Sequence, residues 1–278
     1  MSLGILTNVA ATYAENNLNQ TQGSLQTVLQ QLSSGSRINS GADDAAGLSV
    51  ADGLHANEAA LNQSAQNAQN GVGLLQTADG ALSQVTNLLD RATTLATEAS
   101  NGGLTAAQST AADTEFQSII TEIGNIGGKT NFNSTNVFSA TPTNFVVTDG
   151  TTAGTTTIAT TTGALSSTSI GGVTFAPATD TLTTAALATT TLTDVTNAIA
   201  GISAQRGTLG AGINQLNAAA NVASSESVNL SSAESSIRST NYGQATSDLA
   251  KFQVLSQTGI SALAQANSVQ QEILKLLQ

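Results

Sequence analysis

Two amphipathic segments, one toward each end of the protein, constrain the fold more than any other feature. Toward the C-terminal end, apolar or small residues recur in alternating steps of three and four, at Phe252, Leu255, Gly259, Ala262, Ala266, Val269, Ile273 and Leu276. Toward the N-terminal end, heptad spacing is found at Leu18, Leu25, Val28 and Leu32, with Leu29 alongside. Such spacing gives each helix one apolar face. A lone helix of this kind is marginal in water, so we expect the two ends to pair with each other.

Further helices are expected between the terminal segments. Apolar residues recur with a helical period from Ala45 to about Ser100, in a stretch without proline. The sequence "NGGL" (101–104) ends this stretch, because glycine supplies the C-terminal turn of a helix. The same periodicity returns over roughly 105–126, where "GGK" (127–129) is expected to end it, and over roughly 191–236.

The middle of the sequence, about 131–190, is instead rich in Thr, Gly, Ser and Ala and holds both prolines. The stretch "NFVVTDGTTAGTTTIAT" (144–160) predicts a β-hairpin with Asp149-Gly150 as its turn. One or two more short strands are expected in "SIGGVTFAPATDTLTT" (169–184). The order is therefore helices, a small β insert and helices, which predicts a mainly α fold.

The composition indicates which partners to expect. Charged residues make up 9% of the sequence, where about 25% is typical. Charge normally keeps proteins apart, so this protein has either a surface meant to be covered or an Asn/Thr-rich exterior that stays soluble. The net charge of −11 disfavours nucleic acid and anionic membranes as partners, and no apolar run is long enough to span a membrane.

Motifs for catalysis, cofactors or metals are not found. His55 is the only histidine and there is no cysteine, so His-pair metal sites and thiol chemistry are excluded. Neither a dinucleotide fingerprint nor a P-loop is present. Asp43-Asp44 could form a carboxylate pair, but they directly precede the expected helix from Ala45, where carboxylates cap free N–H groups. We therefore expect no enzyme activity, no cofactor and no metal.

Three stretches carry a family resemblance. "LQQLSSGSRINSGADDAAGLSVADGL" (Leu29–Leu54) resembles the N-terminal signature of bacterial flagellins, and "VLSQTGISALAQANSVQQEILKLLQ" (Val254–Gln278) is similar to their C-terminus. "FNSTNVFS" (Phe132–Ser139) resembles the segment that leads into the outer domains of that family. The resemblance covers roughly 1–139 and 191–278, and the middle carries none.

The resemblance implies a long antiparallel helical rod with paired terminal coiled-coil helices and a small β-rich outer insert. It implies an inner coiled-coil domain (1–42 and 237–278), a helical rod domain with β-hairpin elements (43–140 and 191–236) and a small variable outer domain (141–190). The segment before Arg37 has no Lys or Arg, so we expect no cleaved secretory signal. Export by the flagellar type III system and an extracellular place in the flagellar filament are implied.

The implied function is self-assembly into the helical filament used for swimming, with a hook–filament junction protein as the alternative. The implied partners are other copies of the same protein, an export chaperone at the C-terminal helix, hook-associated and cap proteins, and Toll-like receptor 5. Residues that match the receptor epitope are Arg91, Leu95 and Glu122, for which subunit contact is the alternative role. Packing between subunits is expected at Leu18, Leu25, Val28, Leu32, Arg37, Leu255, Leu263, Val269, Ile273 and Leu276.

Overall fold

The computed structural model describes residues 8–151 and 154–276, with side chains up to residue 272. The protein forms two compact units, which we name the terminal unit (Met1–Ala56 with Asn229–Gln278) and the middle unit (Asn57–Val228). In the described residues the helices are α1 (Val9–Ser34), α2 (Ala45–Ser100), α3 (Ala106–Lys129), α4 (Ala185–Arg238) and α5 (Tyr242–Leu276). Short antiparallel strand pairs lie between α3 and α4. The predicted mainly α fold with a small β insert is confirmed.

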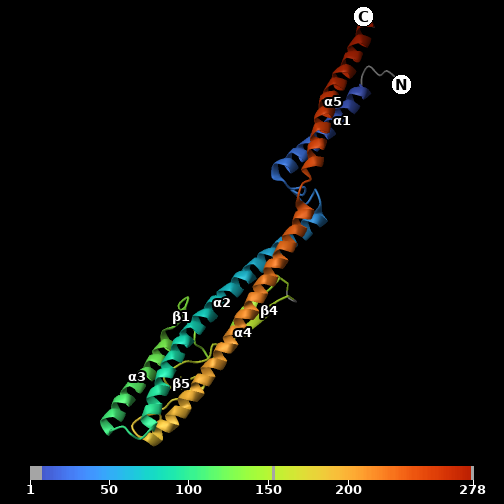
Figure 1. Ribbon diagram of the computed structural model, residues 1–278. Helices are drawn as coiled ribbons and strands as arrows, with labels where there is room; N and C mark the ends of the chain where they lie inside the picture. The colour runs from blue at the N-terminus through green and yellow to red at the C-terminus, as the bar shows by residue number, and fades with distance from the viewer. Residues whose placement is uncertain (1–7, 152–153, 277–278) are drawn as a thin grey trace. The chain divides into compact units, whose positions relative to one another are not determined.

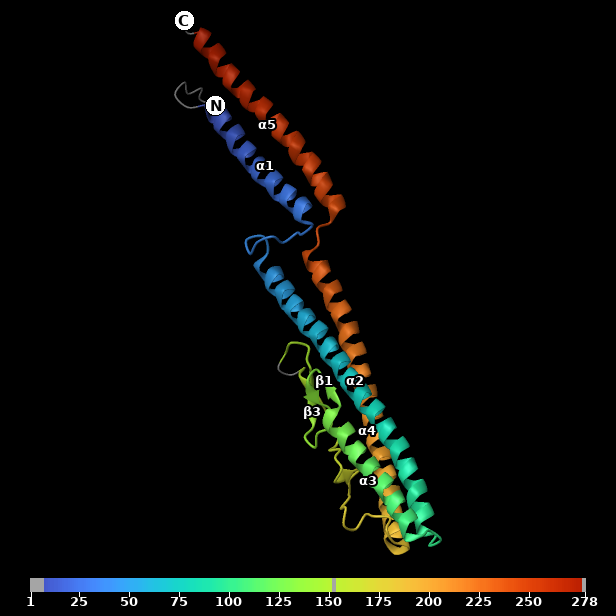
Figure 2. The same ribbon diagram turned by 90° about the vertical axis from the view of Figure 1, so that its left-hand side faces the viewer.

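In the terminal unit, α1 and α5 lie side by side and run antiparallel (Figures 1 and 2), so the predicted pairing of the two ends is confirmed. Asn8 caps α1, because its Oδ1 accepts a hydrogen bond from the Ala11 N–H at 3.1 Å. The Asn8 Nδ2 donates to the Ala266 carbonyl of α5 at 2.9 Å. Leu18 packs on Gly259, where an added Cβ would lie 3.2 Å from the Leu18 Cδ1. Glycine at that position therefore permits close approach of the two helices.

The segment between α1 and α2 is built on glycine and aspartate. Gly35 ends α1 with φ +71, a left-handed conformation that glycine adopts without strain. Asp44 caps α2, since its Oδ1 accepts from the Gly47 N–H at 2.8 Å, and this confirms the capping prediction for Asp44. Asp43 instead accepts from the Asn39 and Ser40 N–H groups, which lowers the pKa of its carboxyl. The two adjacent aspartates thus fix two different turns.

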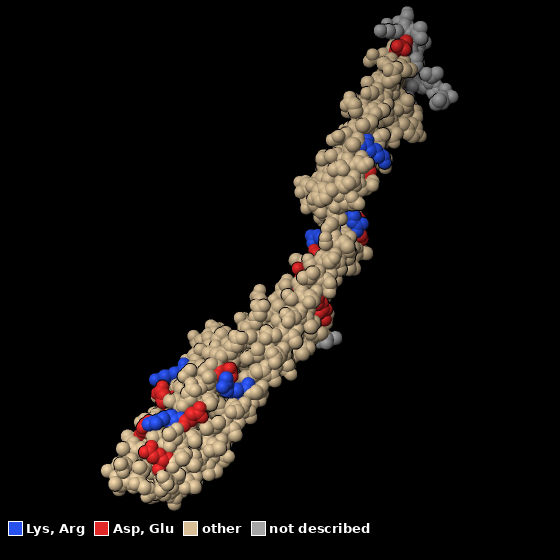
Figure 3. Space-filling model, in the orientation of Figure 1, with Lys and Arg blue, Asp and Glu red and all other residues tan. Residues whose placement is uncertain are grey.

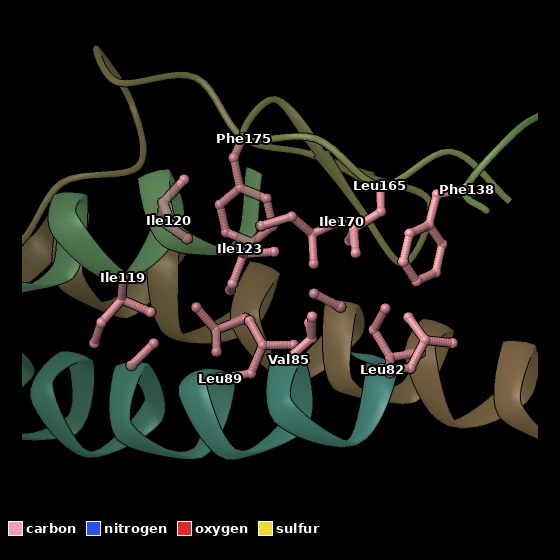
Figure 4. Packing of buried hydrophobic residues seen from close by; sticks show 14 of the residues in the cluster. Leu82, Val85, Leu89, Ile119, Ile120, Ile123, Phe138, Leu165, Ile170 and Phe175 are labelled. Atoms are coloured by element: carbon pink, nitrogen blue, oxygen red, sulfur yellow. The ribbon is translucent and has the colours of Figure 1, made fainter. Parts of the chain in front are cut away.

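The middle unit has one hydrophobic core shared by α2, α3, α4 and the insert. Helices α2 and α3 contribute the inward-facing Leu82, Val85, Leu89, Ile119, Ile120 and Ile123, and the insert contributes Phe138, Leu165, Ile170 and Phe175 (Figure 4). Helix α4 contributes a row with helical spacing at Val195, Ile202, Leu209 and Leu216, each at most 1% exposed. The insert is therefore packed on the helices and does not form a core of its own.

The insert consists of three hairpins in the described residues. Strands β1 (Asn131–Phe132) and β2 (Thr135–Asn136) pair first, followed by β3 (Thr143–Val147) with β4 (Thr156–Thr160) and β5 (Ser169–Ile170) with β6 (Val173–Thr174). The expected hairpin over 144–160 and the expected short strands after it are confirmed. The β1–β2 hairpin agrees with the β-hairpin elements that the resemblance implies within 43–140, and its turn residues Asn133 and Ser134 have positive φ angles of 49° and 63°.

The predicted turn at Asp149-Gly150 lies between β3 and β4, with Gly150 at a positive φ of 89°, but it is part of a longer connection. The last paired residues are Val147 and Thr156, so the connection spans residues 148–155. The Thr148 backbone also binds α2: its N–H donates to the Ser64 Oγ at 2.8 Å, and that Oγ donates to the Thr148 carbonyl at 2.7 Å. This contact fixes the end of β3 on α2.

Two predicted helix boundaries are also corrected. Helix α4 begins at Ala185 and not near 191, because the Thr184 hydroxyl caps it by accepting from the Leu187 N–H at 3.4 Å. Helix α3 continues through Lys129 rather than ending before the glycines. Gly127 lies inside this helix, and the Leu165 backbone is so close that an added Cβ would overlap its carbonyl group. Among the described residues, no helix is both long and apolar enough to cross a membrane.

Candidate functional site

The candidate site is the surface of α1 and α5 that stays exposed after the two helices have packed against each other. On α1 the less exposed residues include a row with three-four spacing, at Ala11, Ala14, Leu18, Thr21, Leu25, Val28 and Leu32. On α5 they include a row with the same spacing, at Phe252, Ser256, Gly259, Leu263, Ala266 and Gln270. These two rows form the seam between the helices, and we name them the seam rows.

The α5 seam row is not the row that the sequence predicts. Only part of the predicted stripe belongs to the seam, namely Phe252, Gly259 and Ala266. The remaining described members are exposed and lie one heptad apart at Leu255, Ala262 and Val269, which we name the flank row. Leu255 and Val269 are each 44% exposed. Helix α5 therefore has two adjacent apolar rows, and α1 covers one of them.

Other large apolar residues of the pair are exposed as well. Val254 and Ile260 on α5 are 64% and 49% exposed, and Tyr13 and Leu29 on α1 are 68% and 48% exposed. Among the described residues of α1, Val28 is the buried one. From Phe252 to Gln271 the sequence of α5 has no charged residue. Figure 3 shows correspondingly few charged residues over α1 and α5 on the face in view.

The predicted apolar packing residues fall into three groups. Leu18, Leu25, Val28, Leu32 and Leu263 lie in the seam rows, and Leu255 and Val269 lie in the flank row. The backbone of Ile273 and Leu276 belongs to α5, but their side chains lie outside the described part of the protein. The structure thus gives the α1 leucines a partner within the same subunit, whereas the flank-row residues Leu255 and Val269 stay 44% exposed.

Arg37 joins two distant segments within the terminal unit. Its Nη2 donates to the Ile237 carbonyl at 2.8 Å, and its backbone N–H donates to the Arg238 carbonyl at 2.7 Å. Ser36 and Ser239 form an antiparallel bridge beside it. The Asp44 carboxylate lies 4.0 Å from Arg37, which at this exposure is a weak ion pair. Arg37 therefore connects residues 36–37, which follow α1, to residues 237–239, at the end of α4.

The three residues that match the receptor epitope have different environments in the structure. Arg91 makes a bidentate ion pair with Glu115, with Nε–Oε1 at 2.7 Å and Nη2–Oε2 at 3.1 Å. This pair raises the pKa of Arg91 and lowers that of Glu115, mainly through the hydrogen bonds. Leu95 is 3% exposed, so it belongs to the core. Glu122 accepts from Asn125 at 3.1 Å. The sequence did not predict Glu115 as the partner of Arg91. The two residues meet because α2 and α3 pack antiparallel in this register.

His55 is a surface residue of the terminal unit. Its Nδ1 lies 3.4 Å from the Glu234 carboxylate, which also accepts from Arg238 Nη1 at 3.3 Å. His55, Glu234 and Arg238 thus form a small polar cluster at the surface.

Comparison with known proteins matches both ends of the sequence. The bacterial flagellin N-terminal helical region matches residues 5–143, and the bacterial flagellin C-terminal helical region matches residues 192–277. A flagellin of Halalkalibacterium halodurans is 30% identical over 97% of this chain and 98% of its own length. A flagellin of Listeria innocua is 28% identical over 98% of both chains.

Other matches are shorter. Flagellin 1 of Proteus mirabilis is 37% identical over 54% of this chain, and the match spans 41% of that protein, less than half of its length. Among solved structures, the crystal structure of Bacillus cereus flagellin is similar at 31% identity, with a TM-score of 0.46 over 56% of this chain and 88% of that chain.

Proposed function

Because this chain belongs to the bacterial flagellin family and is a structural subunit of the flagellar filament, we propose that the flank row of α5 is a surface through which it self-assembles. The observation that carries the proposal is the second apolar row, Leu255, Ala262 and Val269, left exposed beside the seam. Helices with apolar residues at heptad spacing bury them against another helix. Since α1 already occupies the seam, the helix that covers the flank row belongs to a neighbouring copy.

The energetic argument is one of burial. Covering a large aliphatic residue contributes about 1.5–3 kcal/mol relative to leaving it exposed. Leu255 and Val269 are 44% exposed, Ile260 is 49% exposed and Val254 is 64% exposed, so together they provide several kcal/mol per subunit for association. Ordering the subunit opposes this gain, so only the surplus drives assembly.

The electrostatics favour the same surface. A helix that remains in water normally carries charged residues, because charge limits self-association. The stretch Phe252–Gln271 has none, and α1 has one, Glu15. A neighbouring helix therefore meets no like charge on this part of α5. If the contact between copies is head-to-tail and does not close, it generates an open helical filament.

We also propose the domain boundaries and partners that the resemblance implies. The inner coiled-coil domain is 1–42 with 237–278, the rod domain is 43–140 with 191–236, and the outer domain is 141–190. Export by the flagellar type III system, an extracellular filament, an export chaperone on α5, and hook-associated and cap proteins belong to the same proposal. So does Toll-like receptor 5, for which the exposed residues Arg91 and Glu115 provide a polar surface. Nothing in the described residues favours the hook–filament junction alternative.

The test places a charge on the flank row and the same charge elsewhere on α5. Leu255→Asp and Val269→Asp should prevent salt-induced polymerisation, because a buried unpaired carboxylate is costly. Gln257→Asp adds the same charge at another exposed α5 position and serves as the control. Sedimentation and electron microscopy read the outcome. Filaments of normal length from both flank variants would contradict the proposal, as would equal loss of assembly in the Gln257 control.

A further inference from the structure

We propose that Asn101 is a site of spontaneous deamidation, and that the fold protects the other Asn-Gly pair of the protein from the same reaction. Asn-Gly occurs twice in the sequence, at Asn70-Gly71 and at Asn101-Gly102. In this reaction the backbone nitrogen of the following residue loses its proton and attacks the asparagine Cγ. Glycine in that position offers no Cβ to hinder the approach. The two pairs therefore have equal local chemistry, and their structures decide which one reacts.

Asn101 lies in the exposed turn between α2 and α3. Helix α2 ends at Ser100, and Asn101, Gly102 and Gly103 are all exposed. The Asn101 N–H donates to the Glu98 carbonyl at a long 3.3 Å, and within the described residues no hydrogen bond from the Gly102 N–H is found. A Cβ added at Gly102 or Gly103 would meet nothing within 4 Å. The Gly102 nitrogen is thus free to move toward the Asn101 carboxamide.

Asn70 lies in the opposite environment. Asn70 and Gly71 are in the interior of α2, where each N–H is held in a hydrogen bond to the carbonyl four residues earlier. Gly71 is buried, and a Cβ there would lie 2.9 Å from the Leu216 Cδ1 and from the Phe145 Cδ1. Attack by the Gly71 nitrogen would require this part of the core to open, which is costly.

The reaction balances with water as the only co-reactant. The new bond joins the Gly102 nitrogen to the Asn101 Cγ, and the Cγ–Nδ2 bond of Asn101 breaks to release ammonia. The resulting five-membered imide takes up one water at either carbonyl, which gives aspartate or isoaspartate. The product adds a carboxylate to a protein whose net charge is already −11. It does so at the C-terminal end of α2, close to Glu98, where the helix dipole disfavours negative charge.

The test compares the two sites within one protein. Full-length protein is incubated at neutral and mildly alkaline pH and digested with trypsin, which separates Asn70 (in 38–91) from Asn101 (in 92–129). Mass spectrometry with fragmentation then gives the two rates. We expect Asn101 to deamidate at least about ten-fold faster than Asn70, since Asn70 reacts only after local opening of a core helix. The Asn101 rate should also rise with pH. Equal rates in the native protein, or a faster Asn70, would overturn the proposal.

Two controls test whether the fold or the local sequence sets the deamidation rates. In denaturant the two sites should react at similar rates, and a persistently slow Asn70 would show that the fold is not what protects it. Gly102→Ala should slow the reaction at Asn101, because a Cβ then stands beside the attacking nitrogen. Gly103→Ala changes an equally exposed glycine and should leave the rate unchanged. An unaltered rate in Gly102→Ala would also count against the assignment.

Discussion

Replacing Gly201 with alanine tests how the insert is seated on α4. Gly201 faces the β5–β6 turn, and an added Cβ would overlap the carbonyl group of Gly171. The turn itself lies close to α4, because Gly171, at φ +59, has the Ala198 carbonyl and the Ile202 nitrogen as near neighbours. Since backbone opposes backbone here, neither side can yield by rotating a side chain. The turn must move away from α4 and draw the fully buried Ile170 partly into water.

The expected change in the free energy of unfolding is the difference between one gain and two costs. Alanine in place of glycine in a helix gains about 1 kcal/mol. Overpacking costs about 1–3 kcal/mol, and partial exposure of Ile170 removes part of the roughly 1.5–3 kcal/mol that its burial contributes. The net loss is therefore about 1–2 kcal/mol. For a domain of this size, that lowers the melting temperature by roughly 2–8 °C.

The matched control is Gly207→Ala in the same helix. Gly207 is exposed and a Cβ there would meet nothing within 4 Å, so only the propensity term remains and the protein should gain about 1 kcal/mol. Thermal unfolding of the monomer at low salt, followed by circular dichroism, gives both values. The reasoning is refuted if Gly201→Ala melts at or above the parent temperature, or if the two variants shift in the same direction.

Three further predictions concern charge and capping. Burial raises the pKa of Asp194 in the folded state, and the hydrogen bond and charge of Asp180 add to this effect. The stability that Asp194 contributes is therefore present at low pH and is lost as pH rises through the raised pKa. Asp194→Asn should therefore raise the melting temperature at neutral pH and not at acid pH; equal shifts at both would contradict this. Asp44→Ala should cost about 1 kcal/mol in guanidinium unfolding through loss of the α2 cap, with Asp52→Ala, inside the helix, as the control. Moderate salt should promote assembly of this protein, whose net charge is −11, by screening repulsion, and sedimentation unchanged by salt would argue against it.

Periodicity predicted the helices well and their lateral pairing less well. The bounds of α2 agree with the sequence pattern because its apolar row is long and ends at a clear glycine signal. On α5, the pattern could not distinguish the seam row from the flank row. Both rows have heptad spacing, and Ser256 and Gly259 in the seam suit close approach to α1 rather than hydrophobic burial. Only the position of the partner helix separates them.

The remaining differences arise from tertiary contacts that override local signals. The Asp149-Gly150 dipeptide is a strong turn signal, but the pairing of Val147 with Thr156 places it in a longer connection, whose first residue Thr148 binds Ser64 of α2. The glycines after Ile126 normally end a helix, yet α3 continues because Gly127 makes room for the Leu165 backbone. The Arg91–Glu115 pair depends on the register between two helices, which a single sequence does not specify.

The pairing of α1 with α5 has a consequence for the order of folding. Asn8 and Ala266 are hydrogen bonded across 258 positions of sequence, so the two paired helices are far apart along the chain. Contacts of such high sequence separation form late, since closing a long loop costs entropy before the contacts stabilise anything. The middle unit, with α2 and α3 adjacent in sequence, can fold earlier and bring the two ends closer. We therefore expect the terminal pair to form after the middle unit and to open more readily than it.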